Sequence, residues 1–396
     1  MVDKIGLIYT SRYMEYNFGP DHPLRPLRLK LTYSLMEKLG LLNHNLLEIY
    51  EPHGAKIEDI ERVHSSDYIN VVKKLSENPE DRTVQPFVYG LGPGDNPIFK
   101  GMYDASALVC GASIKAADLV WKENDIVHAF NPAGGLHHAL RNKASGFCIF
   151  NDIAVAIKYL KTLKKDIRIA YLDIDCHHGD GVQWLFYDDP NVLTISFHQS
   201  GKFLFPGSGN TTEQGEGSGK GYSINFPLLP GTTNKMFIKL FRYCVPRILE
   251  IYSPDLLFTQ LGVDMHYNDP LTQMGLSISA YRDIAQTMET SARDYCQNRW
   301  VAVGGGGYLM TVVPRAWTLF LAKMLGVELE NELPPSWIQE VKDSVKYEDT
   351  PYLLWDRNDS SEKDLLSHPE IAKKMIDYNN ELKLLCDEKY IPNLKS

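Results

Sequence analysis

Paired cysteines are missing from this sequence. Its six cysteines are scattered, and no two of them have a CxxC spacing. A disulfide framework and a thiolate zinc site both need closely spaced pairs, so the sequence excludes both. Any metal ion bound by this chain must therefore have His, Asp or Glu ligands.

Basic residues are also in the minority. The 396 residues contain 41 Lys and Arg against 50 Asp and Glu, which gives a net charge of -9. Direct nucleic-acid binding needs clustered Lys and Arg to neutralise phosphates, so we expect none. An acidic surface instead favours a cationic substrate through long-range attraction.

Long apolar runs are absent as well. No segment approaches the roughly 18 uninterrupted apolar residues of a membrane helix, and residues 1–10 have no signal-peptide pattern. We therefore expect a cytoplasmic protein without membrane contact. The Gly-rich segment 207–221 lacks the spacing of a phosphate-binding loop, because no Ser or Thr follows Lys220. We interpret this segment as a surface loop.

Short aliphatic runs alternate with helical patterns along most of the chain. This alternation predicts an α/β fold, a single domain whose central, mostly parallel β-sheet is flanked by helices on both faces. The predicted strands are residues 4–9, 125–130, 167–175, 192–198, 256–262 and 300–303. The predicted helices include residues 102–122, 152–162, 234–252 and 279–295. Strand signals then stop, so we predict a main domain, 1–326, and a C-terminal helical extension, 327–396, packed on it.

Polar clusters follow five of the predicted strands. In open α/β sheets, ligands bind outside the carboxyl ends of the strands, so these clusters mark one functional edge. The alternative is that capping Asp residues and structural His residues happen to end several strands. That alternative becomes hard to sustain for five strands together. The clusters are residues 131–138, 173–180, His198, Asp264 and 304–308.

The cluster after residue 172 has the composition of a metal site. Side chains alternate along a strand, so Asp173 and Asp175 point the same way, and His177 continues that face if the chain turns just after it. Catalytic zinc keeps three protein ligands and an open position for water. We assign Asp175, His177 and Asp264 as ligands, with Asp173 supporting them from behind.

The adjacent His137 and His138 suit proton transfer. Hydrolysis by a metal-activated water requires one group that takes a proton and one that protonates the leaving amine. A neighbouring Asp raises the pKa of a His and fixes its tautomer, so we pair His137 with Asp173 and His138 with Asp180. Tyr308, after four glycines, is placed to stabilise the oxyanion.

These motifs closely resemble the histone deacetylase superfamily, in particular its bacterial and archaeal members related to acetoin-utilisation proteins. The likeness runs from about Ile5 to about Gly326. The matching motifs are residues 22–28, 63–68, 132–138, 145–148, 173–181, 196–198 and 304–308.

The resemblance implies an arginase-like, three-layer α/β/α fold, one catalytic zinc or iron(II) ion and a narrow tube for an acyl-lysine. Gly146, Phe147 and Phe205 would line the tube, and Asp95 would hold the substrate backbone at its rim. Leu271 could serve as tube wall or as core. The resemblance also implies two structural potassium sites. The first lies near Asp173, Asp175, His177, Ser196 and Phe197, and the second near Phe186, Asp189, Val192 and Tyr222.

The function indicated is hydrolysis of N-ε-acetyl-lysine, or of a longer acyl-lysine, in a protein or peptide by a zinc-dependent deacylase. One alternative is an acetylpolyamine or other small-molecule amidohydrolase of the same superfamily. An arginase-like ureohydrolase would need carboxylates for two manganese ions, and the run 173–180 favours a single site. A catalytically silent acyl-lysine binder is expected to lose a ligand, a His or the Tyr, and none is missing. Zinc and iron(II) both accept this ligand set, and the acyl chain length and oligomeric state stay open.

Overall fold

The structure, a computed structural model, describes residues 3–123, 125–346, 348–356 and 360–395. Its centre is an eight-stranded sheet in the order β2-β1-β3-β8-β7-β4-β5-β6, in which every pair of neighbours is parallel. The strands are β1 Lys4–Ile8, β2 Leu47–Tyr50, β3 Ile126–Asn131, β4 Ile169–Asp173, β5 Val192–Gln199, β6 Ser223–Leu228, β7 Leu256–Gln260 and β8 Trp300–Val303. The predicted α/β fold class is confirmed.

The two strands that the sequence analysis missed are both at the edges of the sheet. β2 is largely half-buried, so it lacks the continuous apolar run of an inner strand. β6 contains Pro227, which cannot donate a ladder hydrogen bond. An edge position tolerates that loss, and the resulting sequence pattern is weak.

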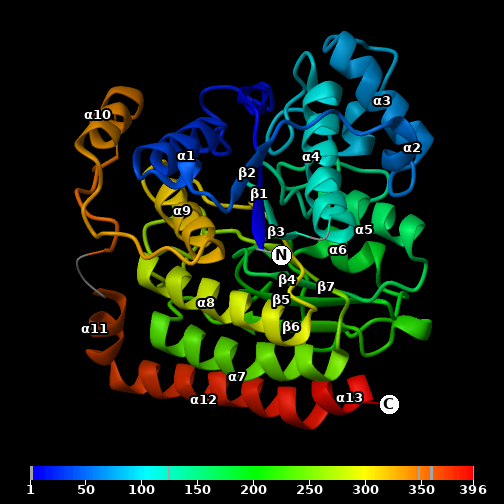
Figure 1. Ribbon diagram of the computed structural model, residues 1–396. Helices are drawn as coiled ribbons and strands as arrows, with labels where there is room; N and C mark the ends of the chain where they lie inside the picture. Colours follow the sequence, from blue (N-terminus) through cyan, green and yellow to red (C-terminus); the bar gives the residue numbers. More distant parts are fainter. Residues whose placement is uncertain (1–2, 124, 347, 357–359, 396) are drawn as a thin grey trace.

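The helices form layers on both sides of the strands (Figure 1). α4 Met102–Lys122 packs against α5 Asp152–Leu163, while α1 Leu27–Lys38, α9 Val313–Met324, α8 Ile278–Tyr295 and α7 Asn234–Tyr252 form a second row, each packing on the next. The remaining helices are α2 Ile57–Ile60, α3 Ser66–Glu77, α6 Asp180–Leu185, α10 Pro335–Ser344, α11 Ser360–Leu366, α12 Pro369–Leu385 and α13 Ile391–Lys395. No helix in the described residues is long and apolar enough to cross a bilayer.

The C-terminal helices cover the β6 edge of the sheet. α12 and α13 pack along α7 (Figure 1). The Tyr390 hydroxyl donates to the Asn225 carbonyl at 2.7 Å, and the Tyr378 hydroxyl donates to the Pro227 carbonyl at 2.8 Å. An open edge strand is a template for unwanted pairing, so this cover protects the sheet.

Residues at the start of α5 connect the helix layer to the loop after β3. The Asn151 side chain caps α5 by accepting from the Ala154 N–H, and its amide donates to the carbonyls of His137 and Ala139. The buried Asp152 carboxylate accepts from the N–H of Leu136 at 2.7 Å. The first turn of α5 therefore fixes the backbone of the segment that contains His137.

Replacing Asn151 by Ala is expected to destabilise the fold by about 1–3 kcal/mol, because the cap and the buried amide donor are both lost. Urea unfolding followed by circular dichroism measures the loss. Asn151→Ser is the matched control, because its hydroxyl keeps the cap but is too short to replace the amide contacts with the two carbonyls. Its urea midpoint should lie between those of the wild type and Asn151→Ala. Equal urea midpoints for wild type and Asn151→Ala would contradict this role.

Candidate active site

The carboxyl ends of the four central strands bring the predicted residues together. β3, β8, β7 and β4 are consecutive neighbours in the sheet, so the segments that follow them meet at one edge. The β5 end differs from expectation. His198 lies at the same edge, but its ring bonds the Ser196 hydroxyl at 2.8 Å and the Gly209 carbonyl at 3.0 Å. It holds the following loop and takes no part in the cluster of ligands.

Asp175, His177 and Asp264 form a compact cluster of metal-ligand type. Their ligand atoms all lie within 4.8 Å of one another. His177 Nδ1 is 2.9 Å from Asp264 Oδ2 and 3.2 Å from Asp175 Oδ1, and all three residues are buried. Burial and the charge of Asp175 raise the pKa of Asp264 to about 6. A divalent cation would neutralise this paired charge, so the donor set fits a metal ion.

The two carboxylates are also held by amide N–H groups. Asp175 Oδ2 accepts from the Gln260 side chain and from the Gly306 N–H, each at 2.7 Å, while Asp264 Oδ1 accepts from the Cys176 N–H at 2.7 Å. Gln260 was missed by the sequence analysis. Its signal was a polar residue at the end of an otherwise apolar, buried strand.

Both His residues of the loop after β3 bind an Asp through Nδ1, as predicted. His137 Nδ1 is 2.8 Å from Asp173 Oδ2, and His138 Nδ1 is 2.7 Å from Asp180 Oδ1. Their Nε2 atoms lie 3.0 Å apart. Because both Nδ1 atoms bond carboxylates, an extra proton on either Nε2 makes that ring an imidazolium.

Electrostatics assign that extra proton to His137. Burial acts to lower the pKa of His137, but Asp173 and Asp175 outweigh burial and raise it to about 9. Burial and the neighbouring His137 lower the pKa of His138 to about 4, against the opposing effect of Asp180. The pKa of His137 is therefore raised and that of His138 lowered, although the two rings are adjacent.

Tyr308 faces the same cluster. Its ring centroid lies 6.5 Å from that of His177 and 5.9 Å from that of Phe147. Burial, together with Asp264 and Asp175, raises the pKa of Tyr308 well above its ordinary value, so the phenol stays protonated. Within the described residues the hydroxyl has no hydrogen-bond partner, which leaves it available as a donor to a bound molecule.

Asp269, a residue that the sequence analysis did not single out, connects Tyr308 with Leu271. Its Oδ2 accepts from the Tyr308 N–H and its Oδ1 from the Leu271 N–H, each at 3.0 Å. The carboxylate is buried. Leu271 is half-buried beside this turn, so its position is tied to that of Tyr308.

Two phenylalanines border the cluster, as expected for the walls of a tube. The Phe205 ring lies 5.1 Å from that of His138, edge to face, and 6.4 Å from that of His177. Gly146 lies against both rings, and a Cβ there would be 2.4 Å from the His138 ring and 3.0 Å from the Phe205 ring. Its φ of +49° is also a conformation that favours glycine.

Asp95 lies at the outer end of this wall. It is exposed, and its carbonyl oxygen is 3.2 Å from His22 Nε2. The His22 ring packs edge-on against Phe147 with the centroids 4.5 Å apart. The loop of Asp95 is thus joined to the wall through one buried imidazole. A small cavity of about 20 Å³ lies deeper, among His137, His138 and Tyr308.

Arg28 closes the inner end of this cavity. It is buried, and its guanidinium donates to the carbonyls of Gly305 and Gly307 at 2.7 and 3.0 Å. The same group lies 5.1 Å from the centre of the Trp317 ring. Arg28 therefore fixes the backbone that precedes Tyr308.

The residues expected around potassium lie on β4, β5 and their neighbours. Asp173 and Ser196 are register partners, and Phe197 follows Ser196 on β5. In the second group the chain turns tightly, because the Asp189 N–H donates to the Phe186 carbonyl and the Val192 N–H to the Asp189 carbonyl. The Tyr222 carbonyl accepts from the Thr194 N–H. Both ion sites stay predictions.

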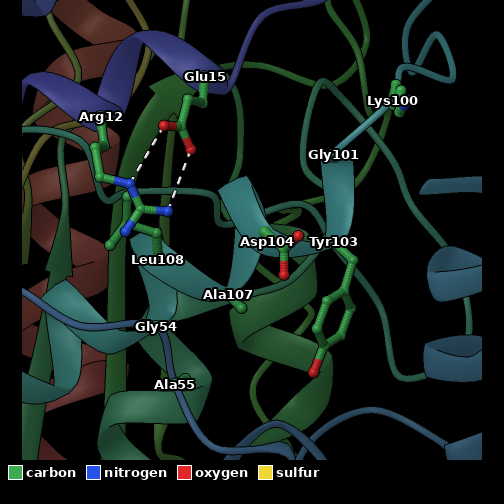
Figure 2. A pocket seen from close by; sticks show the side chains of 10 residues that line it. All are labelled: Arg12, Glu15, Gly54, Ala55, Lys100, Gly101, Tyr103, Asp104, Ala107 and Leu108. Atoms are coloured by element: carbon green, nitrogen blue, oxygen red, sulfur yellow. Dashed lines mark hydrogen bonds and ion pairs between the residues drawn. The ribbon is translucent and has the colours of Figure 1, made fainter. Parts of the chain in front are cut away.

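A second hollow of about 490 Å³ lies beside the start of α4 (Figure 2). Figure 2 shows the ion pair between Arg12 and Glu15 at its side, with the side chains of Lys100 and Asp104 near its opposite wall. These four charged residues are exposed, and none of the predicted site residues lines the hollow. It therefore does not belong to the candidate active site.

Comparison with known families gives the same assignment as the geometry. Residues 22–324 match the family model of the histone deacetylase domain. The chain belongs to the histone deacetylase family. The match covers every residue of the metal-type cluster, the His pair and Tyr308, and it confirms the resemblance seen in the motifs.

Related members of the histone deacetylase family include proteins named for acetoin utilisation. The chain is 42% identical over 332 residues to the acetoin utilization protein AcuC of Bacillus subtilis (strain 168), covering 84% of each chain. It is 37% identical over 346 residues to AcuC of Staphylococcus aureus (strain MSSA476), covering 86% of each.

Solved structures of the family have the same fold. The HDAC homolog from Aquifex aeolicus superposes with a TM-score of 0.81 at 31% identity, over 96% of this chain and all of that one. An HDAC homolog complexed with SAHA superposes with a TM-score of 0.83 at 30% identity, over the same shares. The general activity of this histone deacetylase family member is thus deacetylation.

Replacing Gly306 by Ala is expected to weaken metal binding at least about tenfold, the scale of changes close to metal ligands. The added Cβ would lie 2.3 Å from Asp264 Oδ2 and 2.8 Å from Asp175 Oδ2. Metal content after dialysis against a graded chelator measures the affinity. Gly54→Ala is the matched control, because its Cβ would meet nothing closer than 3.9 Å. Unchanged affinity in Gly306→Ala would refute the assignment of the two ligands.

Proposed function

We propose that this protein hydrolyses the amide of N-ε-acetyl-lysine, or of a longer acyl-lysine, in a protein or peptide. The observation that carries the proposal is one buried juxtaposition: the Asp175, His177 and Asp264 cluster lies beside a His pair bound to two Asp residues. A Tyr hydroxyl without a partner in the described residues completes the set. Each group has a separate use in amide hydrolysis.

Asp175, His177 and Asp264 would hold one divalent metal ion, which we propose to be zinc. When bound, such an ion acts as a Lewis acid towards the amide carbonyl and makes a water molecule more acidic. Two oxygens and one nitrogen suit zinc in a catalytic site with an open position, and iron(II) accepts the same donors. The N–H groups on the two carboxylates keep these donors in place.

His138 and His137 divide the proton transfers. The lowered pKa of His138 leaves its Nε2 unprotonated, so it can accept a proton from the attacking water. That proton then goes to the nitrogen of the leaving lysine as the C–N bond breaks. His137, which is bonded to Asp173, lies beside it and would stabilise the negative charge that develops on the substrate.

Tyr308 supplies the remaining donor. Its phenol is protonated, and its ring lies across from His177, so the hydroxyl can donate to the carbonyl oxygen as that oxygen becomes negative. Asp269 and Arg28 hold the peptide bond between Gly307 and Tyr308, because Asp269 accepts from its N–H and Arg28 donates to its carbonyl.

The walls of the site suit a long aliphatic amine. Phe147 and Phe205 offer apolar surface to the methylenes of a lysine side chain, and Gly146 leaves the space between His138 and Phe205. The exposed Asp95 would accept from the backbone of a peptide substrate at the rim. A relative with this fold has been solved in complex with SAHA, which supports a ligand site of this kind. The proposal also includes potassium at the two predicted groups of residues, one around the ends of β4 and β5 and one between α6 and β5 with Tyr222. It further includes a cytoplasmic location.

The test compares a fluorogenic acetyl-lysine peptide with N-acetylputrescine, using the metal-reconstituted wild type, Tyr308→Phe and His138→Ala. We expect peptide turnover in the wild type and a loss of about 10²–10³ in kcat for Tyr308→Phe, the scale of losing one oxyanion donor. Metal content should stay at the wild-type value in both variants, which is the control for intact folding. Faster turnover of the polyamine would instead assign a small-molecule amidohydrolase.

Removing the metal provides a separate prediction. The chelated protein should lose peptide hydrolysis and regain it on addition of zinc or iron(II), because His138 alone cannot make water nucleophilic enough at neutral pH. Turnover by protein shown by elemental analysis to be metal-free would contradict the mechanism.

A further inference from the structure

Residues 348–356, which follow α10, lie against the active site and are outside the residues matched by the family model. The match ends at residue 324, whereas Glu348 and Asp356 follow α10. Each of these two acidic side chains contacts a different turn of the site. Neither residue was singled out from the sequence.

Glu348 contacts the turn that follows Tyr308. Its Oε1 accepts from the Met310 N–H, and its Oε2 accepts from the N–H and the hydroxyl of Thr311, all at 3.1 Å. Met310 and Thr311 are buried. The residue at the N-cap of α9 is Val312, which makes no side-chain cap hydrogen bond. Glu348 therefore supplies acceptors for the buried N–H groups of Met310 and Thr311, in the turn between Tyr308 and α9.

Asp356 contacts the turn that follows Asp264. Its Oδ2 lies 3.1 Å from His266 Nε2 and accepts from the Ile278 N–H at 2.7 Å, while its Oδ1 accepts from Arg315 at 2.9 Å. His266 Nδ1 accepts from the Asn268 N–H, so Nε2 carries the proton donated to Asp356. His266 and Arg315 are both buried, and His266 is only two residues from Asp264.

The two turns are also bonded to each other. Asp269 accepts from the Tyr308 N–H, and its own N–H donates to the His266 carbonyl at 2.8 Å. Tyr308, Asp269, His266 and Asp356 thus form one continuous series of contacts. Holding Tyr308 at one end and the ligand turn at the other fixes the distance between the oxyanion donor and the metal-type cluster.

We propose that Glu348 and Asp356 are positioning residues of the active site: Glu348 orients Tyr308, and Asp356 orients the turn of Asp264. The proposal rests on the deacylase function proposed above. Other contacts of the extension serve a different purpose. Glu340 on α10 pairs with Lys38 on α1 at 2.6 Å, and neither residue belongs to the turns of the site. That pair attaches the extension but does not contact the turns of the site. Glu340 therefore offers a matched control.

The experiment compares full-length Glu348→Ala, Asp356→Ala and the control Glu340→Ala with the wild type, on the acetyl-lysine peptide. We expect kcat to fall at least about tenfold in Glu348→Ala with KM changed less than about twofold, because a displaced Tyr308 affects the transition state more than binding. Asp356→Ala should weaken metal affinity by about tenfold or more. Glu340→Ala should lower the thermal midpoint while kcat, KM and metal affinity stay at wild-type values.

The conservative variants keep the proposal testable if the Ala variants do not fold. Glu348→Gln retains one side-chain oxygen as acceptor, so it should recover most of kcat. Asp356→Asn keeps the shape but loses the ion pair to Arg315, so it should show an intermediate metal affinity. The proposal would be overturned if the thermal midpoints fell alike in all variants while kcat and metal affinity stayed unchanged. Both residues would then have a structural role only.

Two readouts do not depend on turnover. Amide hydrogen exchange of residues 308–313 should accelerate in Glu348→Ala and not in Glu340→Ala, and metal affinity is measured by competition with a chelator. If the wild type hydrolyses no acyl substrate, the deacylase proposal fails, while these two measurements still decide the positioning roles. Unchanged exchange in Glu348→Ala together with unchanged metal affinity in Asp356→Ala would overturn the inference.

Discussion

The burial of Asp175 and Asp264 side by side is the constraint on which the rest of the structure depends. Two carboxylates removed from water repel each other and are costly unless positive charge or donors surround them. In this chain, the groups around the two carboxylates are the His177 ring, the Gln260 amide and the N–H groups of Cys176 and Gly306. A metal ion would supply the remaining positive charge. A site built in this way favours the binding of a cation even when no substrate is bound.

The same concentration of negative charge separates the properties of the two His residues. Asp173 and Asp175 act on His137, while His138 has only Asp180 as its bonded carboxylate and a charged ring as its neighbour. The pKa of one imidazole is thereby raised and that of the other lowered, although the two residues are adjacent in sequence. Because both residues are His, the difference between their pKa values comes from their surroundings. The Asp residues in both surroundings lie at or just after the end of β4.

The sequence was sufficient for the parts of this site whose partners are near in the chain or repeat at strand ends. The closeness of Asp175, His177 and Asp264, the His contacts with Asp173 and Asp180, and the inner strands follow from alternation and strand-end motifs. Gln260 and Asp269 were not predictable in the same way, because each bonds a segment whose approach depends on strand order. β2 and β6 were missed for a related reason: edge strands need no continuous apolar run, so their pattern is weak.

The acidic residues of the extension are a further case in which the sequence does not predict a contact with the site. In sequence, Glu348 and Asp356 lie in a polar stretch that resembles any solvated connection between helices. Their contacts exist only in the folded chain, where the residues after α10 lie against the turns of Tyr308 and His266. The buried N–H groups of Met310 and Thr311 would otherwise lack these acceptors, and such groups are costly to leave unpaired. The turns that follow Tyr308 and Asp264 are therefore held by residues outside the stretch that matches the family model.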